Sequence, residues 1–264
     1  MKWGIYSPRS KHFINKMQYA FSGKDCVFAS RSPGTVELEC FGKVQTIARD
    51  EMLASDVDAV YICTPTMIHS DTVEAAINNR KHVLVEKTPT QSPKYFFFLR
   101  ELAWEQNCKL EVVFQPRFLP WFFGCPRSSS GEISIHLPLG GLHENPIWDV
   151  AFYPIMTMGY LAQGEIEEIA FAKFGSSYRA VILFVNSSWI LNWSVSAPFL
   201  QEINCKGRVY DKCFTGAAGD SIYRNVVEEF EEGHLLGVNR PIDVLQQVFP
   251  IFIEWQNYYE NDVD

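Results

Sequence analysis

The sequence lacks the features that mark membrane, disulfide-bonded and nucleic-acid-binding proteins. None of its apolar runs approaches the roughly 20 residues needed to cross a bilayer, and residues 1–6 show no signal-peptide pattern. Its seven cysteines are scattered without a CxxC pair, so neither a zinc site nor a disulfide framework is indicated. Lys and Arg number 23 against 31 Asp and Glu, and the net charge of −8 argues against nucleic-acid or membrane partners. We therefore expect a cytoplasmic protein of 264 residues with reduced cysteines and no bound metal.

The first half of the chain alternates short apolar runs with helix signals. The apolar runs lie at residues 3–6, 26–30, 59–63, 82–85 and 110–114. They are apolar on both faces, as the strands of a buried parallel sheet are, and Ser70–Asp71 and Ser92–Pro93 favour helix starts between them. This alternation predicts a doubly wound, Rossmann-like domain over residues 1–118, which would bind its ligand at the carboxyl ends of its strands.

The second half shows a different pattern, in which polar and apolar residues alternate. Trp189, Leu191 and Trp193 alternate with Ile190 and Asn192, as in an antiparallel strand with one covered face. Strand signals lie at 132–137, 179–184, 188–196 and 201–210, and helix signals at 149–161, 223–232 and 243–259. The predicted fold class is therefore α/β: a Rossmann-like parallel-sheet domain, then an α+β domain over 119–264 with an open, mostly antiparallel sheet. Apolar residues on the uncovered face predict a homo-oligomer, a dimer or larger.

Residues 58–89 carry a specific arrangement of short motifs. A strand ends in Thr64–Pro65, His69 follows four residues later, and after a helix the next strand ends in Glu86–Lys87. Further matching features are the segment 115–120, the pair Gly140–Gly141, and Asp149 and Tyr153 one helical turn apart. Together they resemble the glucose–fructose oxidoreductase / inositol dehydrogenase (Gfo/Idh/MocA) family. The resemblance implies a nucleotide-binding domain, a second domain with an open sheet, and hydride transfer between a nicotinamide and a small molecule.

The glycine-rich loop of that family is degenerate in this chain. The family has Gly-x-Gly-x-x-Gly or Ala after its first strand, where Ser7, Arg9 and His12 stand here. Glycines at these positions permit a tight turn and let the backbone approach the pyrophosphate. Ser7 and Ser10 can still donate hydroxyl hydrogens, and Arg9 can grip a phosphate with its forked guanidinium. The alternative is that the loop has lost the cofactor.

The end of the second strand predicts the cofactor preference. Ser30–Arg31 stand where an NAD-binding protein carries an acidic residue, and a Ser–Arg pair suits the 2′-phosphate of NADP(H). NAD(H) remains a possible cofactor. By the resemblance, the other cofactor-binding residues are Thr64, Pro65, His69, Glu86 and Lys87.

The candidate catalytic residues follow from the chemistry of hydride transfer. Reduction of a carbonyl leaves an oxyanion that needs a proton, which a Lys or Tyr within reach can supply. By the resemblance, Lys87 lies beside the nicotinamide and Tyr153 is the general acid/base, while Asp149 shares the helix face of Tyr153 and orients substrate or pairs with Lys87. Arg117 and His143 are candidate substrate-binding residues.

These features predict an NAD(P)H-dependent oxidoreductase that acts on a small polar molecule, a sugar or sugar derivative being favoured. Two alternatives stay open. The substituted loop fits a catalytically silent relative that binds a ligand or a partner. The compact segment 31–56 and the small second domain fit a reductase resembling biliverdin reductase, with a larger planar substrate, although Lys87 and Tyr153 argue for carbonyl chemistry.

Overall fold

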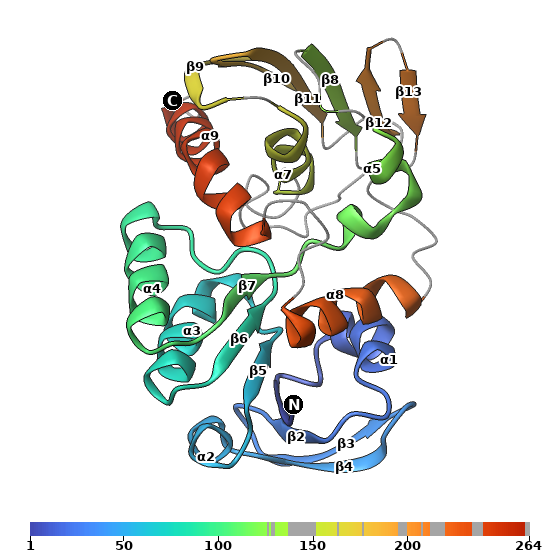
Figure 1. Cartoon of the computed structure of the whole chain (residues 1–264), viewed down its shortest axis with the longest axis vertical. Coiled ribbons are helices and arrows are strands. Elements are labelled where there is room, and N and C mark those ends of the chain that lie inside the picture. The colour runs from blue at the N-terminus through green and yellow to red at the C-terminus, as the bar shows by residue number, and fades with distance from the viewer. Residues whose placement is uncertain are drawn as a thin grey trace. The chain divides into compact units, whose positions relative to one another are not determined.

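The computed structural model divides the chain into two compact units, each built on one β-sheet (Figure 1). One unit comprises residues 1–113 and 219–236, and the other comprises 114–218 and 237–264. The structure describes residues 1–125, 127, 130–136, 152–162, 164–175, 177–194, 200–206, 208–211, 220–233 and 240–261.

The first unit contains a seven-stranded sheet in the order β3-β4-β2-β1-β5-β6-β7. Its strands are β1 Trp3–Tyr6, β2 Cys26–Ala29, β3 Gly34–Leu38, β4 Gly42–Ile47, β5 Ala59–Ile62, β6 His82–Val85 and β7 Leu110–Val112. All neighbouring strands are parallel except the β3–β4 hairpin. β1 and β5 are buried along their whole length, so the predicted Rossmann-like sheet is confirmed.

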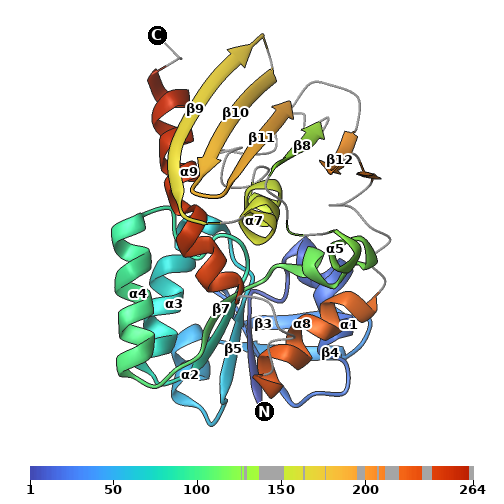
Figure 2. The ribbon, with the colours of Figure 1, turned by 45° about the horizontal axis from the view of Figure 1, so that its top comes forward.

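Helices cover both faces of this sheet. They are η1 Phe13–Met17, α1 Gln18–Ala20, α2 Arg49–Ala54, η2 Thr66–Ile68, α3 His69–Asn78, α4 Pro93–Glu105 and α8 Asp220–Glu232. α3 and α4 lie on one face and α1 and α8 on the other (Figures 1 and 2). α4 begins as expected, with the Ser92 hydroxyl accepting a hydrogen bond from the Tyr95 amide at 3.3 Å. The expected cap of α3 by Ser70 or Asp71 is wrong, because the 3₁₀ turn η2 runs directly into a helix that begins at His69.

The helix α8 packs on the first unit although it comes late in the sequence. The Trp3 indole of β1 donates to the Glu231 carboxylate at 2.7 Å, and Lys24 forms an ion pair with the same carboxylate at 2.6 Å. The Lys109 ammonium donates to the carbonyl oxygen of Phe230 at 3.1 Å, near the carboxyl end of the helix, where a cation is favourable. The domain predicted over 119–264 includes this helix, whereas the contacts of the helix lie with β1 and α1.

The second unit contains a six-stranded sheet in the order β13-β12-β8-β11-β10-β9. Its strands are β8 Ser130–His136, β9 Ile166–Phe174, β10 Ser177–Phe184, β11 Ser187–Ser194, β12 Leu200–Cys205 and β13 Arg208–Asp211. β8 and β11 are parallel and the other neighbours are antiparallel, which confirms a mostly antiparallel sheet. The single strand expected over 201–210 is instead a hairpin, because the chain turns at Lys206 with a φ of 52°.

Helices α7 Phe152–Leu161 and α9 Pro241–Asn261 cover one face of this sheet (Figure 2). Trp189 and Trp193 are buried on that face, and the Trp193 ring meets Trp255 of α9 at 4.6 Å between centroids. α7 and α9 approach closely at Gly159, where a Cβ atom would lie 2.5 Å from a methyl group of Val248. The shorter helices η3 Gln115–Phe118 and α5 Pro120–Gly124 precede the sheet in the chain.

The described residues show no membrane-spanning, metal-binding or disulfide-bonding feature. None of their helices is long and apolar enough to cross a bilayer. These residues include no group of three His, Cys, Asp or Glu side chains arranged for a metal ion. No disulfide joins the cysteines among them.

Candidate active site

Four strand ends meet at one edge of the first sheet. β1 pairs with β2 and β5, and β5 pairs with β6, all in parallel and in register at Tyr6, Ala29, Ile62 and Val85. The residues that follow these strands therefore lie along one edge, which is where a doubly wound sheet binds its ligand. They are Ser7, Ser30, Arg31, Cys63, Thr64, Pro65, Glu86 and Lys87.

Ser7 adopts the backbone conformation that usually requires glycine. Its φ is 73°, in the left-handed region that costs a residue with a Cβ roughly 1–2 kcal/mol. The turn is held by hydrogen bonds from the Ser7 amide to the Ala29 carbonyl at 2.9 Å and from the Ser10 amide to the Ser7 carbonyl at 3.0 Å. The Cys63 thiol donates to the carbonyls of Tyr6 and Ser7, and burial raises its pKa, so it remains a neutral donor. The loop therefore keeps the backbone turn of a glycine-rich loop without the first glycine.

Arg9, at the second glycine position, is held outside the loop. Its guanidinium donates to the carbonyl oxygen of Ser32 at 3.1 Å and lies 3.5 Å from that of Thr35, so it links this loop to the segment after β2. Ser10 accepts a hydrogen bond from the Phe13 amide at 3.1 Å and so begins the helical segment. Ser10 thus has a local structural partner, and Arg9 lies beside the loop that carries Arg31.

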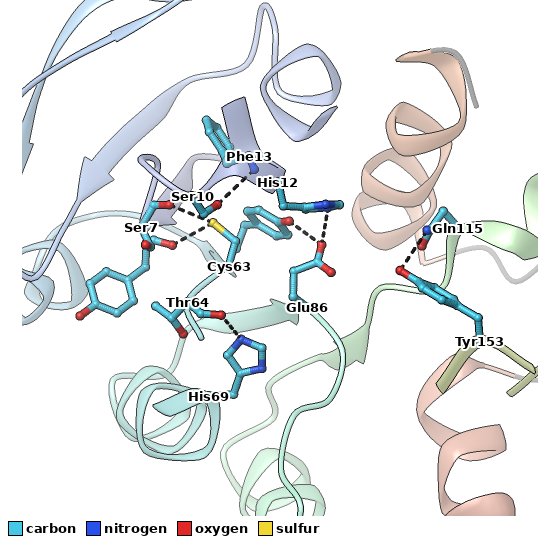
Figure 3. Close-up of polar contacts among 12 residues, drawn as sticks. Ser7, Ser10, His12, Phe13, Cys63, Thr64, His69, Glu86, Gln115 and Tyr153 are labelled. Carbon is cyan, nitrogen blue, oxygen red and sulfur yellow. Dashed lines mark hydrogen bonds and ion pairs between the residues drawn. The ribbon is translucent and has the colours of Figure 1, made fainter. Parts of the chain in front are cut away.

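His12, at the third glycine position, reaches across the sheet edge to Glu86. The His12 Nε2 atom lies 3.0 Å from the Glu86 Oε1 atom, and the Tyr61 hydroxyl of β5 donates to the same oxygen at 2.6 Å. Figure 3 shows the His12 ring directed at this carboxylate. The three side chains connect the segments that follow β1 and β6 with β5 itself.

Burial and charge act on this cluster in opposite directions. Burial favours the protonated form of Glu86, but His12 and Tyr61 outweigh it and lower the pKa of Glu86 to about 2. Burial also opposes charge on His12, yet the Glu86 carboxylate outweighs it and the net pKa of His12 is raised. His12 and Glu86 therefore stabilise each other's charged forms, and Glu86 as a residue is only 8% exposed.

His69 joins the segments that follow β5 and β6. One ring nitrogen lies 2.6 Å from the carbonyl oxygen of Thr64 (Figure 3), and the other lies 2.8 Å from that of Thr88. Burial lowers the pKa of His69, although both carbonyl contacts favour the charged ring. Because both nitrogens have backbone partners, His69 can influence a cofactor by holding these two segments.

The remaining predicted cofactor residues differ in how open they are. Ser30 is buried, and its hydroxyl contacts the Ser32 carbonyl at 2.7 Å and the Thr46 hydroxyl at 2.9 Å. Arg31 and Pro65 are exposed, and Lys87 is partly exposed. The Thr64 hydroxyl oxygen is buried without a hydrogen-bond partner. Arg31 and Lys87 are thus the donors open to a ligand, whereas the Thr64 hydroxyl is a buried donor that lacks a partner.

Tyr153, the predicted general acid/base, lies in the second unit near the start of α7. Its phenolic oxygen accepts a hydrogen bond from the Gln115 side-chain amide at 3.1 Å (Figure 3), and its ring packs against Phe114 and Phe152. Arg117 is only 4% exposed and its guanidinium stacks on Phe118 at 4.9 Å from the ring centroid. Gln115 was not among the predicted site residues.

Asp149 and His143, the remaining predicted site residues, lie outside the described residues, as does the glycine pair before them. The roles assigned to all the site residues stay predictions. His12 and Tyr61 were also not predicted as site residues. One signal for His12 was present in the sequence, since a large titratable side chain stands where the family has Gly or Ala.

Comparison with known families adds to this geometry. Residues 8–114 match the GFO_IDH_MocA family, described as an oxidoreductase family with an NAD-binding Rossmann fold. Residues 8–114 are therefore similar to the Rossmann domain of the Gfo/Idh/MocA family. The resemblance to this family is thereby confirmed.

Three named enzymes are similar to this chain in sequence or in fold. The chain is 28% identical over 163 residues to the dTDP-3,4-didehydro-2,6-dideoxy-alpha-D-glucose 3-reductase of Actinomadura kijaniata. The matched region covers 54% of this chain and 48% of that enzyme. The match thus spans about half the length of that relative. UDP-N-acetylglucosamine 3-dehydrogenase GnnA from Acidithiobacillus ferrooxidans has a TM-score of 0.77 over 96% of both chains, at 16% identity. KijD10, a 3-ketoreductase from Actinomadura kijaniata in complex with TDP-benzene and NADP, has a TM-score of 0.71 over 94% of both chains, at 16% identity. These likenesses confirm the two-domain fold.

Proposed function

We propose that this chain is an NADP(H)-dependent oxidoreductase that transfers a hydride to or from a sugar or sugar derivative. The main support is the meeting of Ser7, Thr64 and Lys87 at the carboxyl edge of a parallel sheet in a domain of an NAD-binding family. Such an edge is the usual nucleotide site of a doubly wound sheet. The names of the relatives add the substrate class.

The residues at this edge fit a nicotinamide dinucleotide. The buried Thr64 hydroxyl has no partner, and a buried polar group of this kind is normally satisfied. Ser7 supplies the left-handed turn, while Arg9 and His12 are held by Ser32 and Glu86. The two large side chains therefore have partners of their own and leave the loop backbone to the pyrophosphate. This argues against the silent-relative alternative, which the substituted sequence of the loop favours.

Arg31 supports a preference for NADP(H). It is exposed and lies two residues after the end of β2, and a guanidinium fork matches the geometry of a phosphate. Ser30 contributes indirectly, because its hydroxyl holds the turn at Ser32 rather than facing solvent. KijD10, which was solved with NADP, shares the fold. NAD(H) is the alternative cofactor.

The chain's own residues would transfer the proton to or from the substrate oxygen. A nicotinamide held at this edge by Ser7, Thr64 and Lys87 would supply the hydride. The substrate oxygen then takes a proton from the Tyr153 hydroxyl, while the Lys87 ammonium stabilises the developing negative charge. The Gln115 amide, at 3.1 Å from the Tyr153 oxygen, stabilises the phenolate that remains. In the reverse direction the Tyr153 phenolate takes the proton from the substrate hydroxyl.

The substrate class is proposed from chemistry and from the relatives together. A sugar presents hydroxyl groups that Arg117, His143 and Asp149 would orient by hydrogen bonds. The two named relatives, a dTDP-sugar 3-reductase and a UDP-N-acetylglucosamine 3-dehydrogenase, act on nucleotide-linked sugars. We therefore favour a nucleotide sugar over the larger planar substrate of a reductase resembling biliverdin reductase.

We also propose that the chain forms a homodimer through the uncovered face of the second sheet. In the part of the chain that the structure describes, no helix packs on this face, and Val181 and Leu183 on it are more than a third exposed. Arg179 donates to Asn192 at 2.8 Å, and Asn192 donates to Glu132, so a polar row crosses β10, β11 and β8. A row with a cation at one end and a carboxylate at the other is complementary to itself under a two-fold axis.

We also propose that the protein acts in the cytoplasm, because a reducing compartment would suit the scattered cysteines of the chain.

The experiment that tests the proposal is a substrate screen with NADPH. Oxidised and reduced sugars and nucleotide sugars are mixed with the full chain, and nicotinamide absorbance is followed in both directions. The assignment is supported if the parent turns over a sugar compound and Tyr153→Phe does not. Binding of NADPH without turnover of any compound would favour the silent relative.

A further inference from the structure

His12 directly connects the segments that follow β1 and β6, two strands that are not neighbours in the sheet. It stands in the loop after β1, and its ring meets the carboxylate of Glu86, the first residue after β6, at 3.0 Å. In the sheet, β5 lies between these two strands, and its Tyr61 donates to the same carboxylate oxygen. A Gly or Ala at position 12 has no side chain that could make this contact, so the connection depends on histidine.

The Glu86 carboxylate requires a cationic partner because it is buried. Its side chain is 11% exposed, while that of His12 is 34% exposed. Removing one partner of a buried ion pair leaves an uncompensated charge, which is strongly destabilising. The next residue in the chain is Lys87, so any movement that relieves Glu86 also moves the backbone that carries Lys87.

We propose that protonated His12 is a positioning residue that fixes the end of β6, and with it Lys87, against the cofactor loop. This inference rests on the proposed function, since it assigns His12 a role in the nicotinamide site. His12 acts through Glu86 and does not itself contact the reacting atoms. Cofactor affinity therefore depends on the charge of His12.

The groups around His12 fix the direction of its pH dependence. Glu86 stabilises the charged ring, and Lys87 and Lys16 oppose it. The Tyr61 hydroxyl reaches His12 only through the shared carboxylate, and the Tyr223 ring of α8 lies edge-on at 5.7 Å. The net pKa of His12 is raised above 6.5, so the ion pair is complete below that pH and is lost as the pH rises through the raised value.

The test measures NADPH dissociation constants by calorimetry at pH about 6.5 and about 9. Four full-length proteins are compared: the parent, His12→Gln, His12→Arg and His82→Gln. His82→Gln is the matched control, because it removes a partly buried histidine at the start of β6, whose ring accepts from the Lys109 amide at 3.0 Å. His12→Arg keeps the positive charge at both pH values.

We expect the parent to lose about tenfold in affinity at the higher pH, within the usual range for coupled sites. His12→Gln should bind weakly at both pH values, His12→Arg should keep its affinity at the higher pH, and the control should follow the parent. Equal pH dependence in the parent and His12→Arg would overturn the proposal, as would unchanged affinity in His12→Gln.

Thermal unfolding without cofactor separates this proposal from the proposed function. The unfolding midpoint of the parent should fall more than that of His12→Arg between pH about 6.5 and about 9, because only the parent loses its ion pair. If this difference is absent, the ion pair does not form and the positioning role is refuted. If the difference is present but NADPH binds at neither pH, the ion pair is real, the proposed function is wrong, and the positioning role fails with it.

Discussion

Replacing Glu86 with Gln removes the charge at the centre of the candidate site while keeping the shape of the side chain. In the parent, the carboxylate accepts a hydrogen bond from Tyr61 at 2.6 Å and lies 3.0 Å from His12. Burial alone would raise its pKa, but these partners lower the pKa of Glu86 from 4.5 to about 2. The folded protein therefore stabilises the charged form of the Glu86 carboxylate.

The size of the effect follows from the shift in pKa. A fall from 4.5 to about 2, at about 1.4 kcal/mol for each unit, corresponds to about 3 kcal/mol of stability at neutral pH. Because the pKa is lowered on folding, this contribution is complete above pH 4.5 and is lost as the pH falls through about 2. Glu86→Gln should therefore be about 3 kcal/mol less stable than the parent at pH 7 and lose part of the acid dependence.

The assay is urea unfolding followed by tryptophan fluorescence, with parent and variant compared at pH about 7 and about 4. Asp56→Asn is the matched control, because Asp56 forms an ion pair with Lys2 at the surface, where the Asp56 side chain is 79% exposed. It should leave the unfolding midpoint almost unchanged. Equal stability of Glu86→Gln and the parent at pH 7 would refute the buried ion pair.

Three further predictions concern the chemical step, the packing of the second unit and the oligomer. Lys87→Met and Tyr153→Phe should each lower turnover by about 10²–10⁴, and lower it more than they lower NADPH affinity, since they act in the transition state; normal turnover in both variants would show that neither residue is catalytic. Gly159→Ala should cost about 1–3 kcal/mol in urea unfolding, because the new methyl group would meet Val248 at 2.5 Å; full stability would show that α7 and α9 can separate easily. The parent should sediment as a dimer at micromolar concentration and Leu183→Asp as a monomer, because Leu183 lies on the uncovered sheet face; a parent that is monomeric at every concentration would contradict the proposed interface.

The sequence predicted the buried parts of the fold well and the surface parts poorly. β1, β5 and β6 appear in the sequence as unbroken apolar runs because both faces of the sheet are covered. The β3–β4 hairpin and the short helix α2 were not predicted, because their residues alternate between buried and exposed over only a few positions. The position of α8 was not predictable from local pattern, because an amphipathic helix does not specify which sheet will cover its apolar face.

The candidate site shows the same division. The strand-end motif was sufficient to bring Thr64, Glu86 and Lys87 to one edge, because parallel strands end together. It did not reveal His12 as the partner of Glu86, because that contact joins residues far apart in the sequence and depends on the path of a loop. Nor did it show that Ser7 would adopt a φ of 73°, since serine has no intrinsic preference for that region.

The central claim is that the edge of the first sheet binds NADP(H), and calorimetric titration of the full chain tests it most directly. NADPH and NADH are titrated into the parent and into Arg31→Asp, which reverses the charge at the exposed position after β2. We predict that NADPH binds the parent more tightly than NADH does, and that the substitution weakens NADPH more than NADH, because a guanidinium at this position would pair with the 2′-phosphate. Equal weakening of both cofactors would contradict the role of Arg31, and the absence of heat from either cofactor with the parent would contradict the account as a whole.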